Sequence, residues 1–185
     1  WQVKVGDEVV DAKQVIVATG SKARHLPGIP VDNKIVCDNV GALDIDIVPK
    51  KLAVIGAGVI GLEMGSVWRR LCADVTLLEA LPDFLSVVDV DVAKEAAKVF
   101  AKQGLKIVTG IEIGDVKISQ KGVSIDYTDK GGNEQKLDAD RLIVSIGRIP
   151  NTDGLDADKV GLHINERGQI VVDAHCRANL PGVWA

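Results

Sequence analysis

The feature that most constrains the fold is an apolar run that leads directly into a glycine-rich hexapeptide and then into a helical pattern. Residues 52–55 are typical of a buried strand, and glycines follow at positions 56, 58 and 61. Apolar residues then recur at helical spacing over residues 59–71, and a second apolar run covers residues 74–79. A helix between two buried strands forms a right-handed crossover, so this pattern predicts a parallel sheet.

Further runs extend this sheet and add an antiparallel part. Residues 89–103 have an amphipathic helical pattern between an aspartate typical of an N-cap and a glycine typical of a helix end, and Val92 and Val99 belong to its apolar stripe. Buried strands are expected at 105–108 and 142–146. Between them, period-two alternation with glycine-containing turns predicts an antiparallel meander. Its three strands are expected at residues 116–119, 123–127 and 134–137.

The flanking segments are less regular. Residues 1–10 alternate around a Gly-Asp turn and predict a short hairpin, and residues 14–20 predict a buried strand that ends in glycine. Residues 21–50 hold three of the six prolines and predict a connection with one short helical turn. The chain begins at Trp1 and ends at Ala185 inside apolar sequence, so we expect a piece of a longer polypeptide.

The hexapeptide fits the pattern G-x-G-x-x-G, which alone is weak evidence because glycine-rich turns are common. Here a strand precedes it and a helix follows, as the mechanism requires. Gly56 permits a tight turn, Gly58 permits close approach of a pyrophosphate, and Gly61 permits close packing of helix and sheet. The helix dipole then favours the phosphates. The sequence therefore predicts a Rossmann-like α/β fold that binds a dinucleotide.

The end of the second strand predicts which dinucleotide. Glu79 stands 18 residues after Gly61, where a carboxylate accepts hydrogen bonds from the adenosine ribose and repels a 2′-phosphate. Residues 80–84 supply no Arg or Lys for such a phosphate. We expect NAD rather than NADP. The alternative is a structural glycine turn with a solvated glutamate at the strand end.

Composition excludes several other functions. The chain of 185 residues is 46% hydrophobic and 26% charged, as in globular domains, and its net charge of −4 argues against nucleic-acid binding. No apolar run approaches the ~18 residues of a membrane span, and no secretory signal opens the chain. The three cysteines form no C-x-x-C pair and fit a reducing cytoplasm. The three histidines lack partners at ligand spacing, so we expect no metal site.

Three segments resemble the flavoprotein disulfide reductases. Residues 15–21 (VIVATGS) resemble their A-T-G segment, residues 56–68 (GAGVIGLEMGSVW) their NAD fingerprint, and residues 144–151 (VSIGRIPN) their second glycine segment. The order and spacing fit, and the resemblance covers essentially the whole chain. Within the family, the run that follows the glycines is most similar to the dihydrolipoamide dehydrogenases.

This resemblance implies a division of the chain and a set of cofactor contacts. Residues 1–48 would be the end of an FAD-binding domain and its connection, residues 49–152 an NAD-binding domain, and residues 153–185 the return toward the FAD-binding domain. Ile60 and Glu63 would lie where nicotinamide meets flavin, and Glu63 is the one possible flavin-proximal partner. The residues expected to contact NAD or FAD are Thr19, Gly20, Ser21, Gly56, Ala57, Gly58, Val59, Ile60, Gly61, Leu62, Glu63, Glu79, Ile113 and Gly147.

The resemblance also implies a function for a longer parent protein. That protein would oxidise dihydrolipoyl groups with NAD⁺ by way of FAD and a redox disulfide. The C-x-x-x-x-C segment for the disulfide is absent from this chain, as are the catalytic His and Glu of the family. The chain alone would therefore bind NAD(H) and be inactive. The parent would be a cytoplasmic homodimer that acts on a lipoyl-carrying protein.

Three alternatives stay open. A mercuric reductase-like or transhydrogenase-like enzyme of the same family would share these motifs. An NADH oxidase or a ferredoxin reductase would share the two-domain flavin architecture but is a poorer match to the run after the glycines. A non-catalytic NAD-binding domain would keep the fold and bind no flavin.

Overall fold

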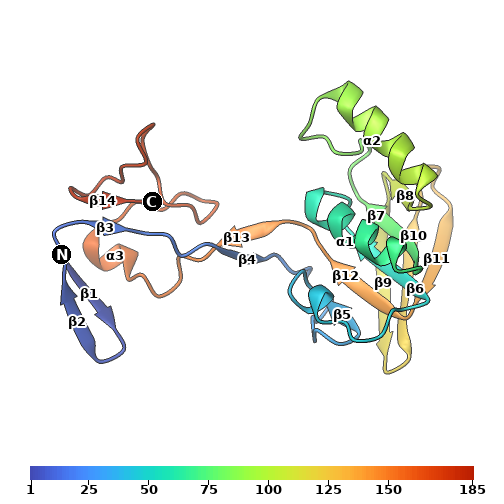
Figure 1. Ribbon diagram of the computed structural model, residues 1–185, viewed down its shortest axis with the longest axis horizontal. Coiled ribbons are helices and arrows are strands. Elements are labelled where there is room, and N and C mark those ends of the chain that lie inside the picture. Colours follow the sequence, from blue (N-terminus) through green and yellow to red (C-terminus); the bar gives the residue numbers. More distant parts are fainter. The chain divides into compact units, whose positions relative to one another are not determined.

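The computed structural model describes residues 1–185, which form two compact units (Figure 1). One unit is continuous and comprises Ala23–Gly147, and the other combines Trp1–Lys22 with Arg148–Ala185. The domain boundaries at 48/49 and 152/153 that the resemblance implies stay a prediction. In the structure, β5 (Val36–Cys37) is fully buried and pairs with β12 (Arg141–Val144), so that the proline-containing segment packs within the continuous unit.

A five-stranded parallel sheet forms the centre of the continuous unit. Each strand pairs in parallel with its neighbours, which confirms the parallel sheet expected from the sequence. From one edge to the other the strands are β5, β12 (Arg141–Val144), β6 (Lys51–Ile55), β7 (Asp74–Glu79) and β8 (Lys106–Thr109). β6 therefore has β12 on one side and β7 on the other.

Along the chain, one helix follows β6 and another follows β7. α1 (Val59–Arg70) joins β6 to β7 and buries Leu62 and Trp68 in the core. α2 (Val90–Lys102) begins at Asp89, whose side chain accepts hydrogen bonds from two N–H groups of the first turn. The apolar stripe predicted for α2 is only partly buried: Ala93 is buried, whereas Val92 is 58% exposed. Ala93 near its N-terminal end is its one buried residue, and toward its C-terminal end the ring of Phe100 meets that of Phe84 edge-on.

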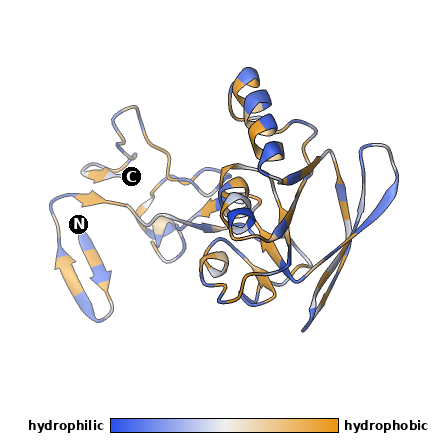
Figure 2. Cartoon of the chain, turned by 45° about the vertical axis from the view of Figure 1, so that its right-hand side comes forward, coloured by the Kyte–Doolittle hydropathy of each residue, from blue (hydrophilic) through white to orange (hydrophobic).

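The antiparallel meander expected from the sequence is present. It covers the face of the parallel sheet opposite α1. It consists of β9 (Glu112–Ser119), β10 (Gly122–Thr128) and β11 (Glu134–Ala139), with β10 in the middle. Val123 and Ile125 of β10 share a buried cluster with Leu78, Leu142 and Val144 of the parallel sheet. Apolar colour is concentrated along the central strands of this unit, whereas the meander and α2 mix apolar and polar positions (Figure 2). The sheet is thus buried on both faces.

The second unit contains short strands around a small core of Ala157, Leu162 and Val183. Its hairpin of β1 (Gln2–Val5) and β2 (Glu8–Asp11) confirms the predicted one. The predicted buried strand over 14–20 is wrong in extent and burial. Only β3 (Val15–Ile16) forms, paired with β14 (Val183–Trp184), and Ile16 is 76% exposed because β14 is its sole neighbour.

The remaining elements are small. β4 (Ser21–Ala23) pairs with β13 (Arg148–Pro150), and α3 (Ala157–Val160) is a single turn. A 3₁₀ turn at Gly41–Leu43 confirms the short helical turn expected in the connecting segment. The longest helix has 13 residues, and none has the length and apolarity required to cross a membrane.

Candidate cofactor-binding site

The turn between β6 and α1 requires glycine at two positions. Gly56 has φ +102°, and a Cβ there would overlap the carbonyl oxygen of Ser145, which follows β12. A Cβ on Gly61 would overlap the carbonyl oxygen of Gly56 itself. The helix therefore packs against the turn, and the turn against the neighbouring strand, at distances that a side chain would prevent.

The surroundings of Gly58 differ from those of Gly56 and Gly61. It is the N-cap of α1 in an extended conformation, and a Cβ built on it meets no atom within 4 Å. The space outside the turn is therefore open to a ligand. No side chain caps the helix. The first-turn N–H groups of any α-helix lack intrahelical partners, and here no side-chain cap accepts from them either. The helix dipole favours a negative group beside them.

Glu79 ties the end of β7 to this turn. Its Oε2 accepts a hydrogen bond from the N–H of Ala57 at 2.8 Å, and its Oε1 accepts one from the N–H of Leu81 at 2.9 Å. Each carboxylate oxygen has two lone pairs, so both can accept a further hydrogen bond from a diol. The carboxylate is thus fixed beside the glycine turn and retains capacity for a ligand.

Gly147 lies beyond the end of β12, on the other side of β6. It is exposed with φ +116°, and its carbonyl oxygen accepts a hydrogen bond from the N–H of Arg24 at 3.0 Å. The chain leaves β6 toward β7, whereas β12 occupies the opposite side, so the carboxyl end of β6 is a topological switch point. Ligands of open parallel sheets bind at such points. Ile113 lies in β9, and its side chain is partly buried against the apolar cluster that the meander shares with the parallel sheet.

The other predicted residues of the turn and of α1 differ in how accessible they are to a ligand. Leu62 is buried in the core, so its side chain is not available to a ligand. Ala57 is buried as well, and its N–H is already bonded to Glu79. Val59 is exposed beside the turn and Ile60 is half-buried. Glu63 is exposed and makes no hydrogen bond or ion pair within the chain.

Thr19, Gly20 and Ser21 lie in the second unit, where they bond to residues that sequence analysis had not assigned a role. Asn151 donates its backbone N–H to the carbonyl of Gly20 at 2.9 Å and its side-chain amide to that of Thr19 at 3.2 Å. Arg148 donates its Nε to the Ser21 hydroxyl at 2.7 Å. The A-T-G and G-R-x-P-N segments, more than a hundred residues apart, are therefore hydrogen-bonded to each other. Their co-occurrence in sequence was the only available signal for this contact.

The cysteines and histidines form no second centre. All three cysteines are free, and no three His, Cys, Asp or Glu side chains are grouped to hold a metal ion. Cys37 is buried in β5, and burial, followed by the charge of Asp32, raises the pKa of its thiol to about 11. His25 lies 3.3 Å from the Asp38 carboxylate. Although burial raises the pKa of Asp38, hydrogen bonds from the N–H groups after it and from His25 lower it overall.

Comparison with known proteins identifies the family. The profile of the pyridine nucleotide-disulphide oxidoreductases matches residues 2–185. This chain belongs to that family. It is 62% identical over all 185 residues to a dihydrolipoyl dehydrogenase of Cupriavidus necator, and it spans 39% of that relative's length. The chain therefore corresponds to about two fifths of that relative.

Two solved structures agree in fold. LpdA from Mycobacterium tuberculosis superposes with a TM-score of 0.85 at 26% identity, over 99% of this chain and 40% of that one. The HOCl-induced flavoprotein disulfide reductase RclA from Escherichia coli gives a TM-score of 0.83 at 28% identity, over 99% of this chain and 41% of that one. These likenesses support the mixed α/β fold expected from the sequence.

Proposed function

We propose that this chain is the NAD(H)-binding part of a flavin-dependent dihydrolipoyl dehydrogenase. The parent protein would oxidise dihydrolipoyl groups, with NAD⁺ as the final acceptor. Support comes chiefly from the 62% identity over the whole chain to a relative of that name. The glycine turn and the carboxylate beside it supply the chemistry that such a role requires of this chain.

The residues present fit a dinucleotide. The first-turn N–H groups of α1 would hold the pyrophosphate, and Gly58 would allow it to approach the backbone. Glu79 would accept hydrogen bonds from the two hydroxyls of the adenosine ribose and would repel a 2′-phosphate, which favours NAD over NADP. Ile113 would flank the adenine, and Gly147 would contact the bound cofactor. These residues bind and orient the dinucleotide, and orientation alone is worth several kcal/mol in such reactions.

The second unit fits part of a flavin site. Thr19, Gly20 and Ser21 would contact the FAD nucleotide, and Asn151 and Arg148 would hold that segment in place. When bound, the flavin supplies hydride transfer between the dithiol side and the nicotinamide side. Ile60 and Glu63 would lie near the flavin, with Glu63 free to pair with a basic group because it has no partner in this chain.

A second candidate function is reduction of another disulfide or oxidant by the same flavin machinery. The superposition on the flavoprotein disulfide reductase RclA favours it. The motifs in this chain are common to both functions. The residues around the redox disulfide of the proposed parent protein would distinguish them.

The deciding experiment is steady-state turnover by the full-length flavoprotein. We expect reduction of NAD⁺ by dihydrolipoamide, with NADP⁺ a much poorer acceptor. Turnover of NADH with other disulfides and none with lipoamide would favour the second candidate. Absence of a visible flavin band would favour a non-catalytic NAD-binding protein.

Gel filtration and cell fractionation would test the cytoplasmic homodimer that we propose for the parent. A pull-down with a lipoyl-carrying domain would test its partner.

A further inference from the structure

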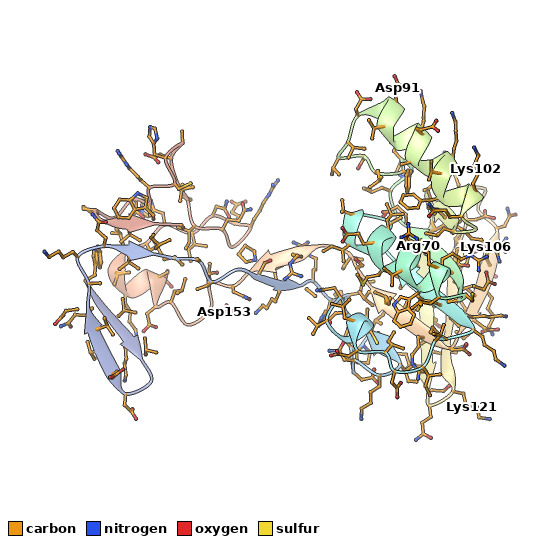
Figure 3. All side chains as sticks on the ribbon, viewed as in Figure 1. Arg70, Asp91, Lys102, Lys106, Lys121 and Asp153 are labelled. Carbon is orange, nitrogen blue, oxygen red and sulfur yellow. The ribbon has the colours of Figure 1, made fainter.

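A pocket of about 490 Å³ lies at the opposite end of β6 from the glycine turn. It is bounded by the start of β6 and by the hairpin between β9 and β10, and Lys121 lies at the tip of that hairpin (Figure 3). Lys50, Lys51 and Lys117 line it as well. A smaller pocket of about 250 Å³ shares Lys51 with it and adds two further lysines. Because Lys51 begins β6 and the turn follows its last residue, this pocket and the dinucleotide site are separate.

The charge of the larger pocket is opposite to that of the chain. Its four lysines make no ion pair within the chain. Only two acidic residues line it, Asp138 and Asp140, so its formal charge is 4 − 2 = +2, whereas the net charge of the chain is −4. One carboxylate oxygen of Asp140 is already bonded to the N–H of Lys51 at 2.9 Å. The pocket is thus a local positive site on an acidic protein.

The backbone that carries Lys51 and Lys121 is ordered by hydrogen bonds. The carbonyl of Lys51 accepts a hydrogen bond from the N–H of Asp140 at 2.9 Å. In the hairpin, the Ser119 hydroxyl donates to the carbonyl of Gly122 at 3.1 Å and accepts from the N–H of Lys121 at 3.2 Å. Fixed attachment points lower the ordering cost when a ligand binds.

A second observation independently indicates a ligand. Ser124 lines the same pocket, and its hydroxyl oxygen is buried without a hydrogen-bond partner, the one such side-chain atom in the chain. By strand register, Ser124 lies between Lys117 of β9 and Asp138 of β11. Buried polar groups are nearly always satisfied in folded proteins, so an unpaired hydroxyl calls for a partner. An anion with several acceptor oxygens, received among the lysines, would supply one once the side chains that cover this hydroxyl move aside.

We propose that this pocket binds a small polyphosphate anion, either inorganic or carried by a nucleoside. The pocket volume lies within the range of small-molecule sites, about 300–1,000 Å³. Lysine ammonium groups bind phosphates as point charges. The proposal concerns a second site and is independent of the function proposed for the glycine turn.

The test uses inorganic tripolyphosphate, titrated by calorimetry into the full-length protein at low salt with the dinucleotide site saturated by NADH. Replacing Lys117 and Lys121 together with alanine removes two charges from the pocket. At about fivefold for each charge pair in water, we expect roughly 25-fold weaker binding. The matched control replaces Lys94 and Lys98, two exposed lysines of α2, and should bind as the wild type does. Unchanged NADH affinity in all variants shows that the fold is retained.

Equal affinity in the pocket and control variants would overturn the proposal, as would the absence of saturable binding to the wild type. Ser124→Ala supplies an independent readout: tripolyphosphate should bind more weakly, while the ligand-free protein should melt at a higher temperature because an unsatisfied hydroxyl is gone. Wild-type affinity in Ser124→Ala would refute an anion seated at that hydroxyl. ATP that binds more tightly than tripolyphosphate, in a lysine-dependent way, would identify a nucleoside polyphosphate as the ligand.

Discussion

Substitution of Glu79 by arginine tests the assignment of the dinucleotide most directly. The carboxylate is held beside the glycine turn by the N–H groups of Ala57 and Leu81, so its charge stands at a defined place. A 2′-phosphate carries a charge of about −1.5 to −2, and unit charges 4 Å apart in water interact by about 1 kcal/mol. Removing the repulsion and adding attraction should together shift the preference by about 3 kcal/mol, which is roughly two orders of magnitude in the ratio of affinities.

The assay is fluorescence titration of the full-length protein with NADH and then NADPH. Glu79→Arg should weaken NADH binding and improve NADPH binding. Glu79→Gln is the control for charge alone, because its amide oxygen can still accept a hydrogen bond from Ala57, and it should shift the ratio by about tenfold. If a folded Glu79→Arg protein kept the wild-type ratio of affinities, Glu79 would not face the adenosine ribose.

Four further predictions address other parts of the chain. Gly58→Val should abolish NADH binding, because the added side chain fills the open space outside the turn. Circular dichroism should show unchanged secondary structure. Full NADH affinity in this variant would refute the turn as the pyrophosphate site. Asp89→Ala should cost about 1 kcal/mol through loss of the cap of α2, measurable as a lower denaturation midpoint. At pH 8, mass-mapped alkylation should modify exposed Cys72 and spare Cys37, whose pKa burial raises to about 11; this protection should be lost on unfolding. Asn151→Ala should loosen flavin retention while NADH affinity stays unchanged, and a flavin content equal to wild type would argue against the role given to Asn151.

Local signals in the sequence sufficed for most of the continuous unit. The helix cap at Asp89, the strand-turn-helix around the glycines and the period-two strands of the meander each depend on nearby residues, and each forms as expected. The proposed site was inferred from the same turn because the chemistry of pyrophosphate binding restricts the residues at fixed spacing. The role of Glu79 was inferred in the same way, and both stay predictions.

What the sequence did not reveal depends on contacts between distant segments. β5 has only two residues, Val36 and Cys37, and no periodicity distinguishes them; they form a strand because β12 lies beside them. The exposure of Ile16 likewise reflects a strand with one neighbour, which an apolar run cannot indicate. The hydrogen bonds of Asn151 join segments 130 residues apart and have no local signature.

The glycine turn is fixed from both sides by the neighbours of β6. On one side, the N–H of Ser145 donates to the carbonyl of Ile55 at 2.8 Å, and on the other the N–H of Gly56 donates to the carbonyl of Leu78 at 2.8 Å. Glu79 then holds the next residue of the turn. A turn fixed in this way would present its N–H groups to the proposed pyrophosphate without a further ordering cost. The binding capacity that we propose for it therefore depends on the arrangement of β12, β6 and β7. For this reason the hexapeptide alone is weak evidence, and the hexapeptide with its strands and Glu79 is stronger evidence.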